Sequence, residues 1–194
     1  MATAVETFDA VSVKNTSIQF IDSDGTQQDG SPIGCVGTIG GETELKEIVK
    51  RCEGVEKKKK TKPIKMNLTL SAHVKQSVLR GIFGLSNQGM KPGIYKYSED
   101  ADAKDFILTA DVIDEFEDVT KLIAFGNCTS ATGLKFTVEN GADELALMEL
   151  EFTAYTDDKG NFMYEALIPE LDDDTIKDTW HTQFNTSLVE VATP

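Results

Sequence analysis

The clearest alternation of apolar and polar residues runs from Ile64 to Val74, and the period then changes. The apolar positions are Ile64, Met66, Leu68, Leu70, Ala72 and Val74, with polar side chains between them. A period of two predicts a strand with one apolar face. From 75 to 85 the stripe formed by Val78, Leu79, Ile82 and Phe83 has helical spacing. This spacing predicts a helix that covers apolar surface nearby.

Two-faced patterns recur along the rest of the chain. They predict strands at 17–21, 93–97, 106–113, 121–127, 134–139, 145–155 and 161–167. The stretch 42–52 is ambiguous between strand and helix, and we favour a strand; the glycine-rich stretch 33–41 is a short strand at best. Turn signals lie at 22–25, 140–141 and 157–160. About eight to ten strands around one helix predict a mainly β, β-rich α+β domain.

The two ends of the chain are patterned differently from its middle. The length of 194 residues, 40% of them hydrophobic, supports one domain, 1–194, with appendages. Residues 1–16 are polar and are interpreted as an N-terminal arm or a short edge strand. After the acidic triplet 172–174, Ile176, Trp180 and Phe184 recur every four residues. Either a short amphipathic helix or an extended tail fits, and we expect 172–194 to form a C-terminal arm outside the core.

A dense run of lysines precedes the strand at Ile64. It consists of Lys57, Lys58, Lys59, Lys60 and Lys62. The ordinary interpretation is a solvated loop over 53–63. The alternative is a projecting basic loop that meets acidic surface on another copy of the chain, with candidate acceptors at Asp114, Glu115, Glu117, Asp118 and the triplet at Asp172.

The overall charge is strongly acidic. There are 19 Lys plus Arg against 33 Asp plus Glu, for a net charge of −14. Such a chain repels nucleic acid at a distance. No apolar run is long enough to span a bilayer, so no membrane partner is expected, and the first ten residues lack the pattern of a secretory signal. The three cysteines, Cys35, Cys52 and Cys128, are widely spaced, which favours reduced thiols in a cytosol.

No motif in the sequence supplies a catalytic or cofactor site. The Asp22–Gly25 run invites a calcium interpretation, but the glycine comes two residues too early for a helix–loop–helix site, so we favour a turn. His73 and His181 are far apart in sequence, and the glycines of 34–41 lack phosphate-loop spacing. Acidic pairs abound without aromatic platforms for sugars. We therefore predict that the protein is not an enzyme and expect no cofactor, no metal and no catalytic residue.

Several blocks of the sequence together resemble the major tail (tail tube) proteins of long-tailed bacteriophages. The blocks are 64–74 (IKMNLTLSAHV), 78–85 (VLRGIFGL), 91–95 (KPGIY), 106–118 (FILTADVIDEFED), 140–144 (NGADE) and 164–168 (YEALI). The likeness extends from about Ile33 to Phe184, and it is a likeness of the overall sequence, not of a catalytic motif. It implies a β-sandwich or barrel with one flanking helix, assembled into rings, usually hexameric, that stack into a hollow tube for DNA ejection. Tape measure, terminator and tail-tip proteins would be partners, in a virion tail made in the host cytoplasm.

The strand pattern agrees with what the resemblance implies. Neighbouring strands of a tube wall need one apolar face and one polar face around a wet lumen. Asn67, Thr69, Ser71, Glu149 and Glu151 are the candidate lumen-facing residues, and acidic or neutral side chains there would let DNA pass without sticking. Two alternatives remain open: a β-sandwich module of a tail tip that binds a ligand or receptor, and the inner tube of a contractile injection system.

Overall fold

The protein folds around one antiparallel sheet, seen in a computed structural model that describes residues 4–116, 119–136 and 147–191. The sheet order is β2-β1-β5-β6-β7-β4-β3, and β8 also pairs with β6. The strands are β1 Ala10–Ile21, β2 Ser31–Pro32, β3 Gly34–Cys52, β4 Val55–Val74, β5 Asp105–Asp114, β6 Thr120–Ser130, β7 Met148–Ala154 and β8 Tyr164–Leu167. The helices are α1 Gln76–Phe83, the 3-10 turn η1 Ile168–Glu170, α2 Thr175–Trp180 and α3 Thr186–Val189. The predicted mainly β class is confirmed.

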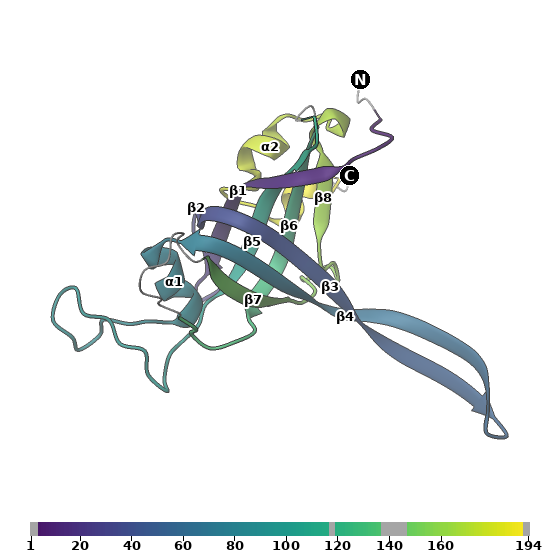
Figure 1. Cartoon of the computed structure of the whole chain (residues 1–194), viewed down its shortest axis with the longest axis horizontal. Coiled ribbons are helices and arrows are strands. Elements are labelled where there is room, and N and C mark those ends of the chain that lie inside the picture. Colours follow the sequence, from purple (N-terminus) through teal and green to yellow (C-terminus); the bar gives the residue numbers. More distant parts are fainter. Residues whose placement is uncertain (1–3, 117–118, 137–146, 192–194) are drawn as a thin grey trace.

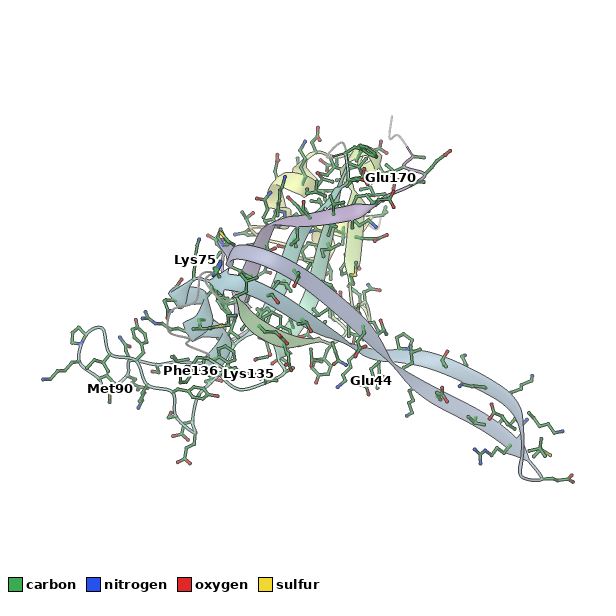
Figure 2. The ribbon with its side chains drawn as sticks, viewed as in Figure 1. Glu44, Lys75, Met90, Lys135, Phe136 and Glu170 are labelled. Carbon is green, nitrogen blue, oxygen red and sulfur yellow. The ribbon has the colours of Figure 1, made fainter. Side chains whose placement is uncertain are left out.

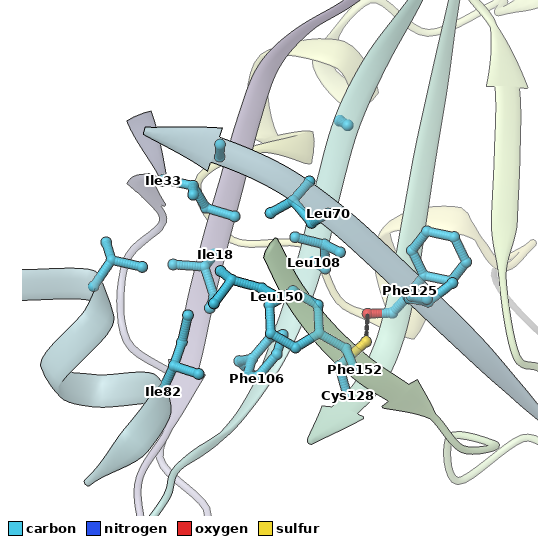
Figure 3. Packing of buried hydrophobic residues seen from close by; sticks show 14 of the residues in the cluster. Ile18, Ile33, Leu70, Ile82, Phe106, Leu108, Phe125, Cys128, Leu150 and Phe152 are labelled. Atoms are coloured by element: carbon cyan, nitrogen blue, oxygen red, sulfur yellow. Dashed lines mark hydrogen bonds between the residues drawn. The ribbon is translucent and has the colours of Figure 1, made fainter. Parts of the chain in front are cut away.

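The main core lies inside the curved sheet, where side chains of β1, β4, β5, β6 and β7 meet one another and α1 packs against them (Figures 1 and 3). The alternation predicted from Ile64 onward is confirmed where β4 enters the core, since Leu68, Leu70 and Ala72 are buried. The helix predicted next is confirmed as α1, which buries all four residues of its apolar stripe. Edge-to-face contact between Phe106 and Phe152, with ring centroids 5.0 Å apart, joins β5 to β7 inside this core.

A second core lies on the other side of β5 and β6. There Ile107, Leu122 and Ala124 pack with Trp180 and Phe184. The last two side chains are each only 1% exposed. The expectation that 172–194 forms an arm outside the core is therefore wrong for the described part of this segment. The apolar back face of β5–β6 needs a cover, and the C-terminal helices provide it.

The longest element is the β3–β4 hairpin, whose far end projects from the body of the sheet (Figure 1). The strand favoured at 42–52 is confirmed as part of β3. The loop expected at 53–63 is wrong: Cys52 pairs with Val55, and the chain reverses at Glu53 and Gly54, with φ of 53° and 80°. The lysines thus lie in β4. Their side chains carry no apolar alternation, but backbone pairing with β3 forms the strand all the same.

Three other predictions need correction or lie outside the described residues. Residues 1–16 are not wholly an arm, because β1 begins at Ala10 and pairs with β5, Val13 opposite Val112. The strand predicted at 93–97 is absent from the described chain there, apart from a bridge between Ser86 and Lys96. Residues 134–136 are irregular, and 137–139 and the predicted turn at 140–141 lie outside the described residues.

Candidate assembly surfaces

The five residues predicted to face a lumen come together on one polar surface. In the β4–β7 register Asn67 lies opposite Thr153, Thr69 opposite Glu151, and Ser71 opposite Glu149. Their neighbours Leu68, Leu70 and Leu150 point the other way into the core. The alternation of side chains therefore gives a polar outer face directly behind an apolar inner face.

This polar surface continues onto β3, which the sequence patterns did not indicate. Thr38 pairs with Ser71, Gly40 with Thr69, and Glu42 with Asn67. The glycines of β3 obscure its alternation, so only the pairing identifies these residues as neighbours. A salt bridge of 2.7 Å between Lys135 and Glu151 offsets part of the negative charge on the surface.

The basic cluster lies along the exposed far half of β4 (Figure 2). Lys58 pairs with Lys50, Lys59 with Val49, Lys60 with Ile48, and Lys62 with Lys46, while Lys57 is the extra residue at a bulge. Lys59 makes an ion pair with Glu47 at 2.5 Å. All five predicted lysines are exposed.

The predicted acidic acceptors are in different situations. Asp114 is only 8% exposed, and its carboxylate accepts the backbone N–H of Asp9 at 2.7 Å. Because Asp114 is buried, it stabilises the fold and is not a surface acceptor for the lysines. Glu115 and the triplet at Asp172 are exposed, whereas Glu117 and Asp118 lie outside the described residues.

A polar network that the sequence patterns did not reveal connects the C-terminal segment to β5. His181 Nε2 lies 2.7 Å from Asp111 Oδ1, and His181 Nδ1 lies 2.9 Å from Thr109 Oγ1. Asn15 donates to the other oxygen of Asp111, and Ser17 donates to the backbone carbonyl of His181. The one signal in the sequence was the spacing of Thr109 and Asp111, two residues apart on one face of a strand.

This network resembles the hydroxyl–imidazole–carboxylate arrangement of nucleophilic enzymes in composition. However, the Thr109 side chain is fully buried, at 0% exposed, beneath the C-terminal segment. A nucleophile must reach an incoming carbonyl carbon, and Thr109 has no open approach. The network's geometry fits a structural clamp that satisfies buried polar groups.

Aspartates in the turns at 22–25 and 157–160 accept hydrogen bonds from nearby backbone N–H groups. Gly25 N–H donates to the Asp22 carbonyl, which confirms the turn predicted there. Hydrogen bonds from Lys104 and then Gln28 lower the pKa of Asp22.

Among the described residues no group of His, Cys, Asp and Glu is arranged to hold a metal ion.

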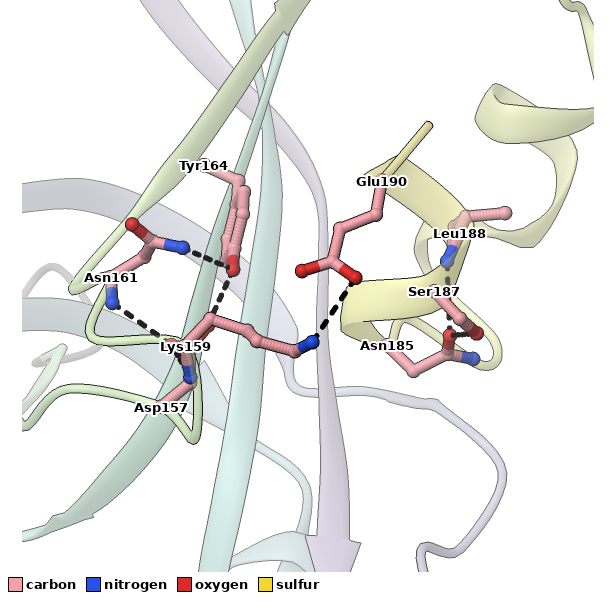
Figure 4. A network of polar contacts seen from close by, with 8 residues as sticks. All are labelled: Asp157, Lys159, Asn161, Tyr164, Asn185, Ser187, Leu188 and Glu190. Carbon is pink, nitrogen blue, oxygen red and sulfur yellow. Dashed lines mark hydrogen bonds and ion pairs between the residues drawn. The ribbon is translucent and has the colours of Figure 1, made fainter. Parts of the chain in front are cut away.

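The turn at 157–160, also predicted, is organised by Asp157 (Figure 4). Burial acts to raise the pKa of Asp157, but hydrogen bonds from the Tyr164 hydroxyl and from backbone N–H groups of Asn161, Lys159 and Gly160 outweigh it and lower the pKa. Burial and the neighbouring Asp157 carboxylate raise the pKa of Tyr164. Lys159 also forms an ion pair with Glu190 at 3.3 Å, so the turn is tied to the residue that follows α3.

Within the described part of the chain, no helix has the length and apolar character needed to cross a membrane.

Comparison with known proteins finds similarity only among solved structures. No protein-family model and no curated protein matches the chain. The chain is similar to a subunit of the sheath-tube complex of an extracellular contractile injection system, PVC, in its extended state (TM-score 0.43, 12% identity, 78% of this chain and 87% of that chain).

Two further similarities are to parts of the anti-feeding prophage, AFP. The first is its tube-terminating cap (TM-score 0.45, 11% identity, 84% of this chain and 94% of that chain). The second is its baseplate (TM-score 0.38, 9% identity, 86% of this chain and 97% of that chain). All three neighbours are components of tail-like particles, and with TM-scores below 0.5 they carry no argument about the role of this chain.

Proposed function

We propose that this chain is a structural subunit that self-assembles, through stacked rings, into the tube of a tail-like particle, and that it is not an enzyme. The observation that carries the proposal is the hairpin arm, defined as residues 44–65. The pairing of β4 with β7 covers only Met66–Ala72. Beyond it the arm is a two-stranded ribbon whose residues are almost all exposed.

A two-stranded ribbon without a core is marginal in water. Its open edges present unpaired backbone groups that favour addition of another strand. Exposed apolar residues lie along it as well: Leu45, Ile48, Val55 and Ile64 are 42–57% exposed. A neighbouring subunit would supply the cover that the single chain lacks, which supports a role in an assembly.

The polar surface of β3, β4 and β7 supports the second part of the proposal. We assign Asn67, Thr69, Ser71, Glu149 and Glu151 to a water-filled lumen. Hydroxyls, an amide and carboxylates would hold no phosphate, so DNA or another anionic cargo could pass through. The resemblance to phage tail tube proteins suggests hexameric rings, a place in a virion tail, and tape measure and terminator proteins as partners.

Negative-stain electron microscopy of the purified protein tests this proposal. We expect rings or hollow tubes from the chain alone. Uniform monomers at every concentration would contradict the proposal and favour the ligand-binding alternative.

A further inference from the structure

The two faces of the hairpin arm differ sharply in charge. From Leu45 to Lys50 the β3 register opposite 58–63 is regular, with no bulge. Side chains therefore alternate cleanly between the two faces. One face carries five lysines and one isoleucine, in three successive cross-strand pairs: Lys46 with Lys62, Ile48 with Lys60, and Lys50 with Lys58. We name Lys46, Lys50, Lys58, Lys60 and Lys62 the lysine face.

The opposite face is balanced and partly apolar. It carries Leu45, Glu47, Val49, Lys59, Thr61 and Pro63. Lys59 there is paired with Glu47. By contrast, none of the five lysines of the lysine face forms an ion pair with a described residue, and all five are exposed.

Like charges placed directly opposite each other destabilise a strand pair. Two of the three pairs on the lysine face are of this kind, in a ribbon that has no core to offset the repulsion. An acidic surface docked on this face would convert the repulsion into attraction. The arrangement is therefore suited to a bound state and poorly suited to an isolated chain.

We propose that the lysine face docks on the acidic segment of a second copy of this chain, which deepens and rests on the proposed assembly. Charge complementarity favours this occupant over nucleic acid. The arm, residues 44–65, holds nine Lys plus Arg against four Glu, whereas the other 172 residues hold ten against 29 Asp plus Glu. A body so acidic would repel a DNA strand that approached the arm, and it would attract the arm of another copy.

The acidic segment is defined as Glu170, Asp172, Asp173, Asp174 and Asp178, all exposed. Within the described part of the chain, only Asp174 among them has a lysine partner, Lys177 at 2.7 Å. In Figure 1 the helix α2 next to this segment and the tip of the hairpin lie at different ends of the molecule. Contact between two such separate surfaces is head-to-tail, which propagates from copy to copy rather than closing as a symmetric dimer.

A charge-exchange experiment tests the docking. The arm variant carries Lys50→Glu, Lys58→Glu and Lys60→Glu. The segment variant carries Asp172→Lys, Asp174→Lys and Asp178→Lys, and it retains Asp173, whose carboxylate accepts the Thr175 N–H. A matched control places the same charge change on exposed lysines elsewhere, with Lys75→Glu, Lys91→Glu and Lys96→Glu. Fluorescence of the buried Trp180 verifies that each variant is folded.

Assembly is measured as the fraction of protein that pellets in high-speed centrifugation. We expect wild type and the control to pellet, and each exchange variant alone to fall at least tenfold. An equimolar mixture of the two variants should recover pelleting, because each acidic arm then meets a basic segment. The proposal is overturned if the arm variant or the segment variant alone pellets like wild type, or if the mixture gives no recovery. It is also overturned if wild type binds a 30-bp DNA duplex through these lysines while the arm variant still assembles.

If wild type itself never pellets, the proposed function fails rather than this inference alone. The two failures are thus distinguishable.

Discussion

The indole Nε1 of Trp180 donates a hydrogen bond of 3.0 Å to the backbone carbonyl oxygen of Ile123, and this bond ties the C-terminal segment to the middle of β6. The Trp180 ring also stacks edge-on against Phe184, with centroids 4.7 Å apart. The C-terminal segment is therefore part of the folded core.

We predict that Trp180→Ala lowers the free energy of unfolding by about 3–5 kcal/mol, because it removes a large buried ring and leaves a cavity. Deleting 172–194 should have a larger effect and leave the back face of β5–β6 uncovered. Urea unfolding followed by circular dichroism measures both. The exposed Tyr97→Ala is the matched control and should change stability by no more than about 0.5 kcal/mol. A truncated chain as stable as the whole chain would disprove this assignment.

The two histidines should behave differently. His181→Ala breaks contacts to Asp111 and Thr109 and leaves buried polar atoms without that partner, so we expect a loss of about 1–3 kcal/mol in unfolding free energy. His73→Ala removes an exposed side chain and should be close to neutral. Equal effects of the two substitutions in urea unfolding would show that the network contributes nothing.

Acid should loosen the turn held by Asp157. Its pKa is lower in the folded chain than its usual value of 3.8, so its contribution is fully present above pH 3.8 and is lost as the pH falls through the folded pKa. We expect Asp157→Asn to be less stable than wild type at pH 7, and the difference to shrink steadily below pH 3.8. Unfolding free energies measured from pH 7 to pH 2 give this difference. A difference that stays constant over that range would contradict the ionic role.

The three free cysteines should separate into two reactive thiols and one protected thiol. Cys35 and Cys52 are exposed, whereas Cys128 is fully buried and burial raises the pKa of its thiol. The thiolate is the reactive form. We expect a chromogenic disulfide reagent to label two thiols in the native protein within minutes and the third only after unfolding. If native wild type labels more thiols within minutes than the Cys128→Ser variant does, Cys128 is accessible and its burial is contradicted.

The accuracy of the sequence patterns varied with the physical origin of each element. Strand β4 near Leu70 and helix α1 were predictable because each has one buried face, and burial on one face imposes a period. The lysine-bearing start of β4, at 55–63, was not, since it forms by pairing with β3 and its lysines record no buried face. The docking of Trp180 was also hidden: β5 is covered on both faces, and its pattern does not say what covers Ile107.

The candidate surfaces, too, were predictable only where alternation along a strand identifies their residues. Alternation along β4 and β7 placed Thr69 and Glu151 on the polar faces of their strands, because residues two apart on one strand share a face, and the register sets the two side by side. It could not add Thr38 and Glu42 of β3, whose membership depends on the register. The role of these residues in a lumen stays a prediction.

Sedimentation velocity of wild type and of a hairpin-shortened chain is the most direct test of the central claim, that the arm makes this chain an assembling subunit. The shortened chain replaces residues 45–64 with a two-residue Asn-Gly turn, so that Glu44 stays opposite Lys65, and it keeps the part of β4 that pairs with β7. We predict that wild type forms species much larger than 21.2 kDa that grow with concentration, while the shortened chain stays folded and sediments as a monomer. A single monomeric species for wild type at all concentrations, or equal assembly by the shortened chain, would contradict the account.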